Sequence, residues 1–463
     1  MTDVNIALLE AKLDQIAPSS AIERLRRRVV EADDAQLFRM NPYTFAEEEG
    51  IAPQQAVEVF LRASMAGLLR PDWALVCRGC GEYAQTLQNL CELGGTFHCA
   101  ACSMTRTTAL DEHVEVGFTV HPEVRSIRFL EPAELPLDDY FFRYTFSPNI
   151  VVRGVGESLV DYLRERALVL VRLAPGEEHA VETDVGVGWI VGSPRAMITV
   201  AGEPTPDRER RTVEVGFDGT QFLPRPTIVP GPVRLVVRNA SDAVQPVLLY
   251  HTPIVTYFDY RPFLSGQGLL NTEEFRRHLG TEVVRPGTGI PTRDNTLLFT
   301  DLRGSTALYD RVGDALAFEL VSAHLEALAR VITRHAGVVV KTIGDAVMAS
   351  FSRPVDAARA ALAMAAAIHS SDRAEALILK IGIHRGPCLV VNVRDHVDYF
   401  GQTVNIAARV QNAAGGKQIC MTAAVFEDLE VKNVFAGLGE VSSEQLSLRG
   451  VGEPWRVYRY TTP

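Results

Sequence analysis

Residues 296–301 form a short apolar run that ends in an acid, Asp301. The run has the length of a buried strand, and the small residues Gly304, Ser305 and Thr306 behind it lead into a helical pattern. A strand, a tight turn and a helix start place backbone N–H groups around an anion, and the adjacent carboxylate can hold a cation. The segment therefore predicts half of a site for a metal-bound triphosphate.

The helix after this turn carries apolar residues at alternating spacings of three and four. This periodicity is typical of a helix that packs on a sheet along one face, and such packing would stiffen the preceding turn. We expect the following residues to belong to the core: Phe318, Val321, Leu325, Leu328 and Ile332.

A second acid lies in a predicted hairpin further along the chain. Residues 338–343 and 346–351 both read as strands, and Gly344 and Asp345 connect them. Glycine at the first position of a two-residue loop suits a tight turn, so Asp345 is expected at its tip. Two acids on neighbouring strands could hold two Mg²⁺ ions about 4 Å apart, as in phosphoryl transfer. The alternative is that Asp345 is an ordinary turn residue.

Three motifs occur in one order within the C-terminal part of the chain. They are Phe299-Thr-Asp-Leu-Arg-Gly-Ser-Thr306, Lys341-Thr-Ile-Gly-Asp345 and Asp398-Tyr-Phe-Gly-Gln-Thr-Val-Asn-Ile-Ala-Ala-Arg409. Together they resemble the class III adenylate and guanylate cyclase catalytic domain, over residues 293–463. The resemblance implies a ferredoxin-like α+β domain, with an antiparallel sheet and helices on one face.

The resemblance also implies that Asp301 and Asp345 bind two Mg²⁺ or Mn²⁺ ions per site, assisted by the backbone carbonyl of Leu302. Lys341 and Asp398 would read the base. An ammonium donates to adenine N1 while a carboxylate accepts from the N6 amino group, whereas guanine presents the opposite polarity on that edge. The pair therefore favours ATP over GTP as the substrate.

In the same family, Asn405 would orient the ribose. Arg409 would stabilise charge on the α-phosphate while the 3′ oxygen attacks in line, giving 3′,5′-cyclic AMP and pyrophosphate. Taken singly, Asn405 could be a capping or solvated residue and Arg409 an exposed helix charge. Their spacing of four residues places both on one helical face.

Phosphate contacts are expected from the turn after the first acid, at Arg303, Gly304, Ser305 and Thr306. Many members of the family also carry a lysine near the C-terminus, inside a Gly-Lys-Gly type segment. Here that stretch reads Arg449-Gly-Val-Gly452, with Val451 in place of the lysine. Binding of the terminal phosphates would then rely on Arg449 or Arg394.

Two Cys-x-x-Cys pairs lie in the N-terminal half. Their members are Cys77, Cys80, Cys99 and Cys102. Two tight thiolate turns at this spacing can close around one tetrahedral Zn²⁺ ion in a reducing compartment. Four thiolates leave no position open for water, so one structural zinc per chain is expected. Cys91 and His98 are spare candidates between the pairs, and the alternative is two unrelated cysteine pairs.

The part of the chain before residue 293 is expected to form three domains and a linker. These are a helical, helix-turn-helix-like domain (1–72), a zinc ribbon (73–110), a β-sandwich regulatory domain (111–260) and a linker (261–292). The region is similar to a regulatory region found ahead of some bacterial cyclases. Its residues do not tell which ligand or partner it senses.

The helix-turn-helix-like segment has the wrong charge for DNA. Its first helix carries Glu47, Glu48 and Glu49, and the second offers only Arg62 before its end. Phosphate contacts need cations, so a structural or protein-contact role is favoured. The basic stretch at residues 24–28 is expected on a solvated helix face.

The acidic balance opposes general affinity for nucleic acids and anionic membranes. The chain has 46 Lys and Arg residues against 57 Asp and Glu residues, a net charge of -11 at pH 7. No apolar run approaches the roughly 20 residues of a membrane helix, and the N-terminus lacks a basic region followed by an apolar one. A cytoplasmic protein without a membrane span is expected.

The family resemblance further implies a homodimer with shared active sites. One chain would supply Asp301 and Asp345, and the other would supply the residues that contact the base, the ribose and the α-phosphate, Lys341, Asp398, Asn405 and Arg409. Two alternatives stay open. The chain could be a guanylate cyclase, or a catalytically silent protein that keeps the cyclase fold as a binding module or scaffold.

Overall fold

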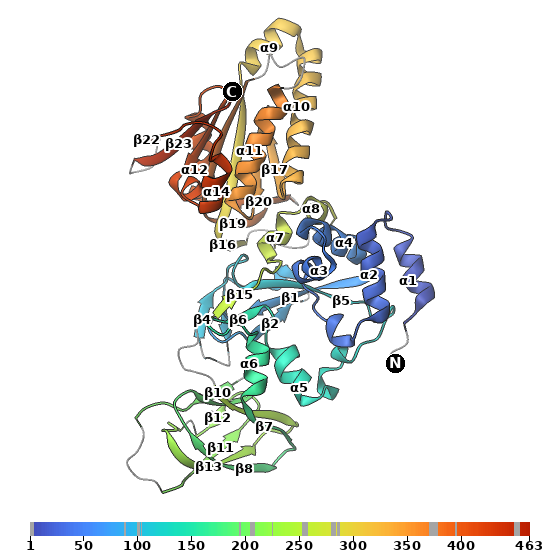
Figure 1. The fold of residues 1–463 in the computed structure, drawn as a ribbon, viewed down its shortest axis with the longest axis vertical. Coiled ribbons are helices and arrows are strands. Elements are labelled where there is room, and N and C mark those ends of the chain that lie inside the picture. Colours follow the sequence, from blue (N-terminus) through green and yellow to red (C-terminus); the bar gives the residue numbers. More distant parts are fainter. Residues whose placement is uncertain are drawn as a thin grey trace. The chain divides into compact units, whose positions relative to one another are not determined.

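The computed structural model describes residues 4–463 except 88, 100–101, 103, 194–195, 204–208, 225, 252–257, 279–283, 285–287, 370–377, 394–395 and 449–453. Of residues 305–307 and 368–369 it describes the backbone and not the side chains. The chain divides into two compact units. The first comprises residues 1–88, 96–107 and 113–264, and the second comprises residues 89–95, 108–112 and 265–463. The first unit is mostly β-sheet with helices, and the second is a mixed α/β unit (Figure 1).

Four helices open the first unit. They are α1 (Ile6–Leu13), α2 (Ser20–Glu31), α3 (Pro42–Glu49) and α4 (Pro53–Met65). The predicted helical pattern is confirmed, and Leu9, Leu13 and Ile16 are buried. Gly50 ends α3 in the left-handed region at φ 65°, which glycine adopts without strain. Pro53 begins α4, where its fixed φ suits the first helical turn.

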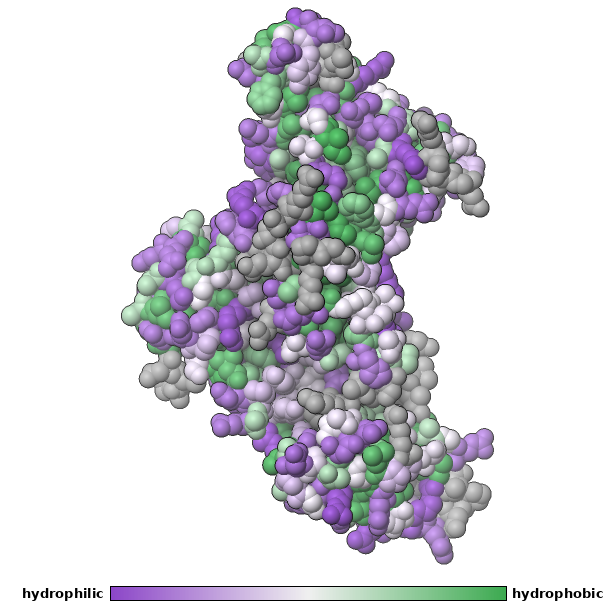
Figure 2. Space-filling view, turned by 180° about the vertical axis from the view of Figure 1, so that it is seen from behind, coloured by the Kyte–Doolittle hydropathy of each residue, from purple (hydrophilic) through white to green (hydrophobic). Residues whose placement is uncertain are grey.

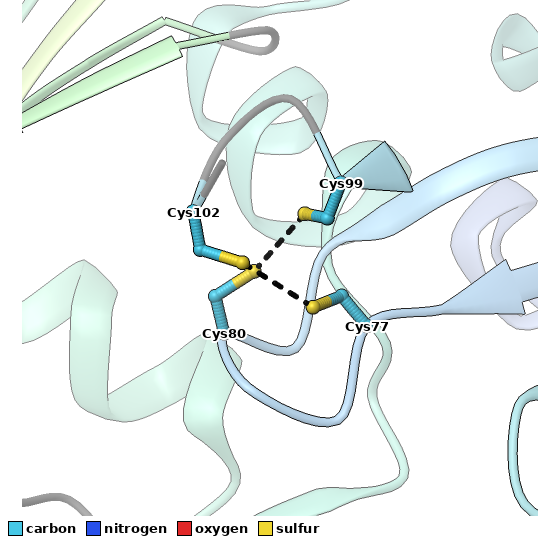
Figure 3. A group of neighbouring side chains, drawn as sticks. All are labelled: Cys77, Cys80, Cys99 and Cys102. Carbon is cyan, nitrogen blue, oxygen red and sulfur yellow. Dashed lines mark hydrogen bonds between the residues drawn. The ribbon is translucent and has the colours of Figure 1, made fainter. Parts of the chain in front are cut away.

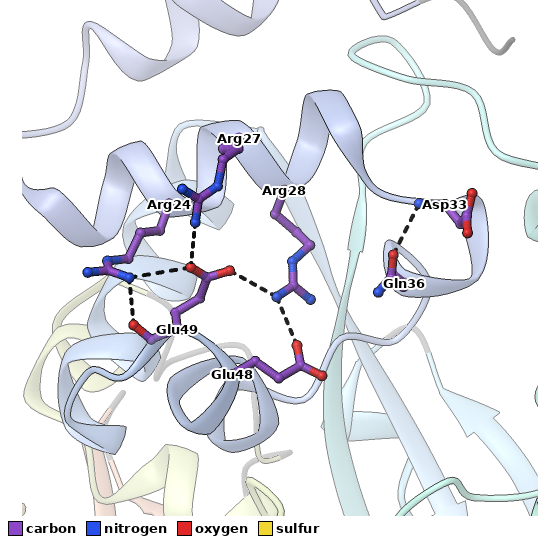
Figure 4. A network of polar contacts seen from close by, with 7 residues as sticks. All are labelled: Arg24, Arg27, Arg28, Asp33, Gln36, Glu48 and Glu49. Carbon is purple, nitrogen blue, oxygen red and sulfur yellow. Dashed lines mark hydrogen bonds and ion pairs between the residues drawn. The ribbon is translucent and has the colours of Figure 1, made fainter.

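The basic stretch of α2 is paired with acids, whereas the sequence predicted a solvated face. Figure 4 shows Arg24, Arg27 and Arg28 around the Glu49 carboxylate at the end of α3, with Arg28 also contacting Glu48. Burial raises the pKa of Glu49, but the hydrogen bond from Arg28 and the charge of Arg27 outweigh it, so the pKa is lowered overall. The acidic and basic stretches therefore join the two helices to each other.

Three small groups of strands follow in the first unit. β1 (Leu69–Val76) pairs with β2 (Tyr83–Leu87) and β5 (Val114–Val120), β3 (Thr96–Cys99) pairs with β4 (Met104–Thr107), and β6 (Ile150–Val152) pairs with β15 (Phe258–Tyr260). The short helices α5 (Leu137–Asp139) and α6 (Leu159–Glu165) lie between β5 and the next sheets in the sequence.

Two four-stranded sheets share one core in the remainder of this unit. One contains β7 (Ala167–Leu173), β9 (Trp189–Ser193), β10 (Ala196–Thr199) and β14 (Gln245–His251), and the other contains β8 (Glu178–Val185), β11 (Arg211–Phe217), β12 (Phe222–Leu223) and β13 (Gly231–Asn239). Val191 and Val247 from the first sheet pack in one cluster with Val215 and Leu235 from the second. The sandwich classification of residues 111–260 stays a prediction.

The second unit is built on an eight-stranded sheet with the order β17-β18-β16-β19-β21-β23-β22, in which β20 pairs with β19. Its elements are α7 (Gly266–Leu270), α8 (Glu273–His278), β16 (Gly289–Arg303), α9 (Ser305–Val312), α10 (Asp314–Arg334), β17 (Gly337–Ile343), β18 (Ala346–Phe351), α11 (Pro354–His369), β19 (Ile378–Val393), β20 (His396–Phe400), α12 (Gln402–Asn412), β21 (Gln418–Thr422), α13 (Ala423–Phe426), α14 (Leu429–Phe435), β22 (Val441–Leu446) and β23 (Trp455–Thr461). Neighbouring strands are antiparallel, except that β19 and β21 are parallel.

Helices cover both faces of this sheet, so the expectation of helices on one face was wrong. Successive side chains of a strand point to opposite faces, and β21 is apolar on both. Ile419 and Met421 pack in one cluster with Ala358 of α11, while Cys420 packs with Ile406 of α12. A strand that is buried on both sides needs a helix on each, and α12 supplies the second one.

The helix expected after the first acid is two helices, because Gly313, at φ 80°, separates α9 from α10. Phe318 is 66% exposed, so its assignment to the core was wrong. It lies one residue, roughly 100° around the helix, from the buried Ala317. The buried residues of α10 are Ala317, Val321, His324, Leu328 and Ile332.

Part of the expected linker, residues 261–292, is folded onto the second unit. Helices α7 and α8 belong to that unit, and β16 begins at Gly289. Gln267 and Asn271 are only 2% and 3% exposed. Buried amides need hydrogen-bond partners, so this segment is tied to the unit by specific contacts.

Hydrophilic residues surround small, separate hydrophobic areas on the face drawn in Figure 2. This surface agrees with a chain in which 22% of the residues are charged. None of the helices in the described part of the chain is long and apolar enough to cross a membrane.

Candidate active site and thiolate cluster

Asp301 lies near the end of β16, where the strand pairs with β19. Its cross-strand partner in the register is Lys380, and the Lys380 Nζ atom lies 2.6 Å from Asp301 Oδ2. The two side chains are 18% and 31% exposed, respectively. Sequence reasoning missed Lys380, because the pairing of β16 with β19 brings it to the acid and no local motif marks it. The structure thus places a cation directly on the first proposed metal ligand.

Asp345 lies in the turn between β17 and β18, as predicted. Gly344 takes a φ of 65°, and the strands close at the pair Ile343 and Ala346. The Asp345 Oδ2 atom is buried and has no hydrogen-bond partner among the described residues. A buried polar atom without a partner costs about 1–3 kcal/mol. A bound cation would satisfy this oxygen.

The two acids end neighbouring strands. β16 pairs with β18 up to Phe299 and Met348, and the Val347 N–H donates to the Thr300 hydroxyl oxygen at 3.1 Å. One-for-one continuation of this register places Asp301 beside the residue that directly follows Asp345. The geometry therefore brings the two proposed metal ligands to the same edge of the sheet.

A buried histidine, His324 of α10, lies within electrostatic range of Asp345. Burial lowers the pKa of His324 to about 4, although the Asp345 charge raises it. The imidazole is therefore neutral at pH 7 and supplies no counter-charge to the acid. Sequence reasoning missed this residue, because it occupies a core position of an ordinary amphipathic helix.

Lys341 and Asp398 form an ion pair between β17 and β20. The Lys341 Nζ atom lies 2.6 Å from Asp398 Oδ2, and the Tyr399 N–H donates to Asp398 Oδ1 at 2.8 Å. The lysine side chain is 41% exposed and the aspartate 14%. The structure therefore brings together the two residues that the sequence assigned to base recognition. Each keeps a defined orientation and access to solvent.

Asn405 and Arg409 lie on α12, which begins after Gly401 as predicted. Asn405 is exposed and Arg409 is half-buried. Neither side chain has a hydrogen bond or ion pair to another residue of the described chain. The Thr403 hydroxyl, which donates to the Pro387 carbonyl, anchors the start of the helix on β19. Both side chains are thus available to a ligand, and no described contact links them to the acids of the same chain.

The turn after Asp301 is described in part. Leu302 is buried and pairs with Leu379 across the sheet, and Arg303 is exposed. Gly304 has a φ of 84° and precedes the first turn of α9. The other proposed phosphate ligands lie outside the described residues or side chains: Ser305, Thr306, Arg394, Arg449 and the neighbouring Val451.

The four cysteines of the two Cys-x-x-Cys pairs converge in the first unit (Figure 3). Their sulfur atoms all lie within 4.8 Å of one another. Cys77 Sγ is 3.5 Å from Cys102 Sγ, and Cys80 Sγ is 3.6 Å from Cys99 Sγ. Sulfur atoms around a tetrahedral zinc with Zn–S bonds of about 2.3 Å lie about 3.8 Å apart. The cluster therefore has the size of a four-thiolate metal site.

The surroundings of the cluster agree with a single closed site. Hydrogen bonds from the Cys102 thiol, and then from the other two, lower the pKa of Cys77, so one thiolate is already favoured. Cys91 belongs to the other unit and is not part of the cluster. His98 is exposed, and its Nδ1 atom lies 3.1 Å from the Thr105 hydroxyl oxygen. The two spare candidates therefore stay outside the ligand set.

Two family models match the chain. One, described as "Family of unknown function (DUF5939)", matches residues 1–277. The other, described as "Adenylate and Guanylate cyclase catalytic domain", matches residues 290–455. The first match ends within α8 and the second begins within β16, so residues 278–289 lie outside both.

Several known proteins are similar to the C-terminal part. Receptor-type adenylate cyclase GRESAG 4.1 of Trypanosoma brucei brucei is 29% identical over 217 residues, which are 37% of this chain and 17% of that protein. An uncharacterized protein of Mycobacterium bovis is 34% identical over 176 residues, which are 37% of this chain and 58% of that protein. The chain thus spans less than two thirds of the length of these relatives.

Among solved structures, an adenylate cyclase from Trypanosoma brucei in its monomeric state is 28% identical. The match covers 36% of this chain and 89% of that chain, with a TM-score of 0.33. The first family model covers more than half of the present chain, and the proposed catalytic motifs lie inside the second match. The chain therefore belongs to DUF5939, a family of unknown function, and its residues 290–455 are a class III adenylate and guanylate cyclase catalytic domain.

Proposed function

We propose that the protein is an adenylate cyclase, which converts ATP to 3′,5′-cyclic AMP and pyrophosphate. The observation that carries the choice of ATP is the ion pair between Lys341 and Asp398. Its ammonium can donate to adenine N1, and its carboxylate can accept from the adenine N6 amino group. Guanine would place an N–H against the ammonium and a carbonyl oxygen against the carboxylate. The similarity to receptor-type adenylate cyclases supports this choice.

Asp301 and Asp345 fit the role of metal ligands. Carboxylates are the ligands that Mg²⁺ and Mn²⁺ prefer, and one oxygen of Asp345 is buried without a partner among the described residues. The Leu302 carbonyl would assist them. When bound, two such ions lower the pKa of the attacking hydroxyl and stabilise charge on the phosphates. The acids would hold this chemistry at one edge of the sheet.

Lys380 is a candidate for the missing phosphate-binding lysine. Val451 stands where many cyclases carry that residue, while Lys380 already holds an ammonium against Asp301. If Asp301 held a cation, the Lys380 ammonium would be free to contact a phosphate oxygen of the nucleotide. A partly buried lysine is worth more to a phosphate than a solvated one, because the lower dielectric strengthens the attraction.

Asn405 and Arg409 would act on the reacting end of the nucleotide. Asn405 would hold the ribose so that its 3′ oxygen faces the α-phosphorus, since orientation of this kind removes a large part of the barrier. The bond from the 3′ oxygen to the α-phosphorus forms, the bond to the β-phosphate oxygen breaks, and the hydroxyl proton is released. Arg409 would stabilise the charge that develops on the α-phosphate.

The active site is proposed to be shared by two chains. Asn405 and Arg409 have no described contact with Asp301 or Asp345, and they lie on helix α12, whereas the acids lie on β16 and in the turn between β17 and β18. A two-fold dimer would bring the acids of one chain to the α12 helix of the other and create two equivalent sites. The N-terminal unit would regulate this assembly.

A structural zinc ion is proposed for the cluster of Cys77, Cys80, Cys99 and Cys102. Four sulfur atoms at the separations of a tetrahedral site, in a reducing compartment, are the preferred ligand set of Zn²⁺. All four positions would be filled by protein, so the ion would stabilise the fold of the first unit without taking part in the chemistry.

A nucleotide assay on the full chain tests the proposal. Purified protein with Mn²⁺ should form cyclic AMP from ATP and much less cyclic GMP from GTP. Exchanging Lys341 for Glu and Asp398 for Cys reverses the polarity offered to the base, so the GTP to ATP turnover ratio should rise about tenfold or more. An unchanged ratio would show that these residues do not face the base, and no product from either nucleotide would favour a silent cyclase fold.

A further inference from the structure

A buried polar network joins helices α7 and α8 to the eight-stranded sheet of the second unit, which we call the catalytic unit. Gln267 Nε2 donates to Asn295 Oδ1 at 2.7 Å. The Ser350 hydroxyl lies 3.0 Å from Asn295 Oδ1 and 2.8 Å from Asn271 Oδ1 and shares its one proton between these two acceptors. Asn295 and Ser350 are fully buried. Because a buried polar group is costly without its partner, these contacts fix the two helices in one place on the sheet.

Arg276 of α8 extends this network to β20. Its Nη1 atom donates to the Val397 carbonyl at 3.1 Å, and its Nη2 atom donates to the Tyr399 hydroxyl oxygen at 2.9 Å. The Tyr399 hydroxyl donates in turn to Asn271 Oδ1 at 2.9 Å. Tyr399 is 2% exposed. The guanidinium thus binds the two residues on either side of Asp398 through two separate hydrogen bonds.

Side chains alternate between the two faces of β20, so the hydrogen bonds of Arg276 have a consequence for Asp398. Val397 and Tyr399 are buried, and Asp398 between them points to the other face, where it meets Lys341. The Tyr399 N–H also donates to Asp398 Oδ1. The position of the carboxylate therefore depends on the residues on both sides of it, and Arg276 holds the backbone carbonyl of Val397 and the side-chain hydroxyl of Tyr399.

Packing alone does not hold β20 against α8. A cavity of about 230 Å³ lies between this helix and strands β17 and β20, lined by Arg276, Val339 and Val397 among others. β20 is paired with β19 along its length. On the side of α8, where apolar packing is interrupted, the directional hydrogen bonds of the guanidinium hold the strand. β17 and β20 are also the strands that carry Lys341 and Asp398.

We propose that Arg276 is a positioning residue for nucleotide recognition, which sets the Asp398 carboxylate at the hydrogen-bonding edge of the base. The inference rests on the proposed role of Asp398. Arg276 lies within residues 1–277, which match the family of unknown function, although it folds as part of the catalytic unit. The end of that family region therefore acts on substrate recognition through Asp398, and a displacement of α8 would alter nucleotide affinity before it altered the chemistry.

The test replaces Arg276 in the full chain by Met, which keeps a long unbranched side chain and removes its donors. Arg276→Met should raise the KM for ATP about tenfold, with kcat changed less than about twofold, and it should narrow the preference for ATP over GTP. Arg276→Lys keeps one cation and should recover part of the affinity. The matched control is Arg277→Met, because Arg277 lies on the same helix with its side chain 63% exposed and pairs with Glu273. It should leave both constants unchanged.

A double-mutant cycle separates positioning from general support of the fold. In an Asp398→Ala background, Arg276→Met should add less than about twofold to the KM, because the group that it positions is gone. Full additivity, or a fall in kcat and thermal stability without a change in KM, would overturn the inference.

A crystal structure of Arg276→Met supplies a readout that does not depend on turnover. We expect the Asp398 carboxylate to move away from Lys341, and an unmoved ion pair contradicts the inference. If the wild-type chain turned over neither nucleotide, or if Asp398→Ala left nucleotide affinity unchanged, the proposed function would fail. The displacement of Asp398 would still decide whether Arg276 positions it.

Discussion

The thiolate cluster and the edge of the cyclase sheet are two candidate metal sites built in opposite ways. The cluster takes all four ligands from two short Cys-x-x-Cys segments, and its sulfur atoms already lie at the separations expected around one metal ion. The sheet edge takes its acids from β16 and from the turn after β17, and Lys380 occupies one of them. A closed site of protein ligands stabilises a fold, whereas an open one leaves room for a substrate. The two sites should therefore fail differently when their ligands are removed.

The largest effect is expected at the sheet edge. Asp301→Asn and Asp345→Ala should each lower cyclase activity at least about a hundredfold, because each removes a carboxylate that would hold both cations. Stability should change much less than activity, because the Lys380 side chain keeps some access to solvent when Asp301 loses its charge, and the buried oxygen of Asp345 has no described partner to lose. Cyclic AMP formation and thermal unfolding measure the two effects, with Asp310→Asn on the exposed side of α9 as the control. Wild-type turnover of either variant with both Mg²⁺ and Mn²⁺ would contradict the assignment.

The reverse pattern is expected at the cluster. Elemental analysis should find close to one zinc ion per chain, and replacement of Cys77 and Cys80 by Ser should abolish it. The free energy of unfolding should fall by several kcal/mol, because binding of a structural zinc is coupled to folding. Cys91→Ser is the matched control, since Cys91 lies between the pairs in sequence and outside the cluster. A metal-free protein of full stability would remove the contrast between the two sites.

A smaller effect, the partial return of cyclase activity in mixed dimers, sharpens the contrast further. Only the site at the edge of the cyclase sheet is proposed to need two chains. Asp345→Ala and Asn405→Ala should each be inactive alone. In a mixed dimer one site carries both lesions and the other carries none, so co-expression should restore activity to about a quarter of wild type if the chains exchange randomly. Differential tags would confirm that mixed dimers form. Persistent inactivity of such dimers would show that each chain builds its own site.

The smallest effect is expected in the pH dependence of the stability of the catalytic unit. Burial lowers the pKa of His384 to about 4, so the unfolded chain binds its proton first as the pH falls below about 6.5. The stability contributed by this residue is present at pH 7 and is lost between pH 6.5 and 4, by at most about 1.4 kcal/mol per pH unit. His384→Gln should flatten this dependence in denaturant titrations, while His98→Gln, at an exposed position, should not. Equal slopes for the wild type and both variants would exclude the effect.

Features that depend on short spacing were predictable from the sequence. The Cys-x-x-Cys pairs, the Gly344 turn and the start of α12 after Gly401 all follow from a few adjacent residues, because local backbone geometry determines them. The pairing of Lys341 with Asp398 was predictable only through the family resemblance. Spacing alone could not bring two residues on β17 and β20 together.

Features that depend on the register and on packing were not predictable. Lys380 reaches Asp301 only because β16 and β19 pair at that position, and a one-residue slip would turn it to the other face. Phe318 fits the spacing of an apolar face, yet the buried face of α10 runs through Ala317 and His324. Both are properties of the assembled sheet, and a helical period is too coarse to fix them.

The segments of residues 89–95 and 108–112 have a consequence for the order in which the protein can fold. They belong to the second, catalytic unit, although most of the first unit, residues 113–264, separates them from the rest of it in the sequence. The Arg293 N–H donates to Asp111 Oδ1 across a separation of 182 residues. At a synthesis rate of about 5–20 residues per second, Asp111 waits roughly 10–40 s for this partner to be made. The catalytic unit therefore cannot complete its native contacts without the N-terminal half of the chain, even though every proposed catalytic residue follows residue 300.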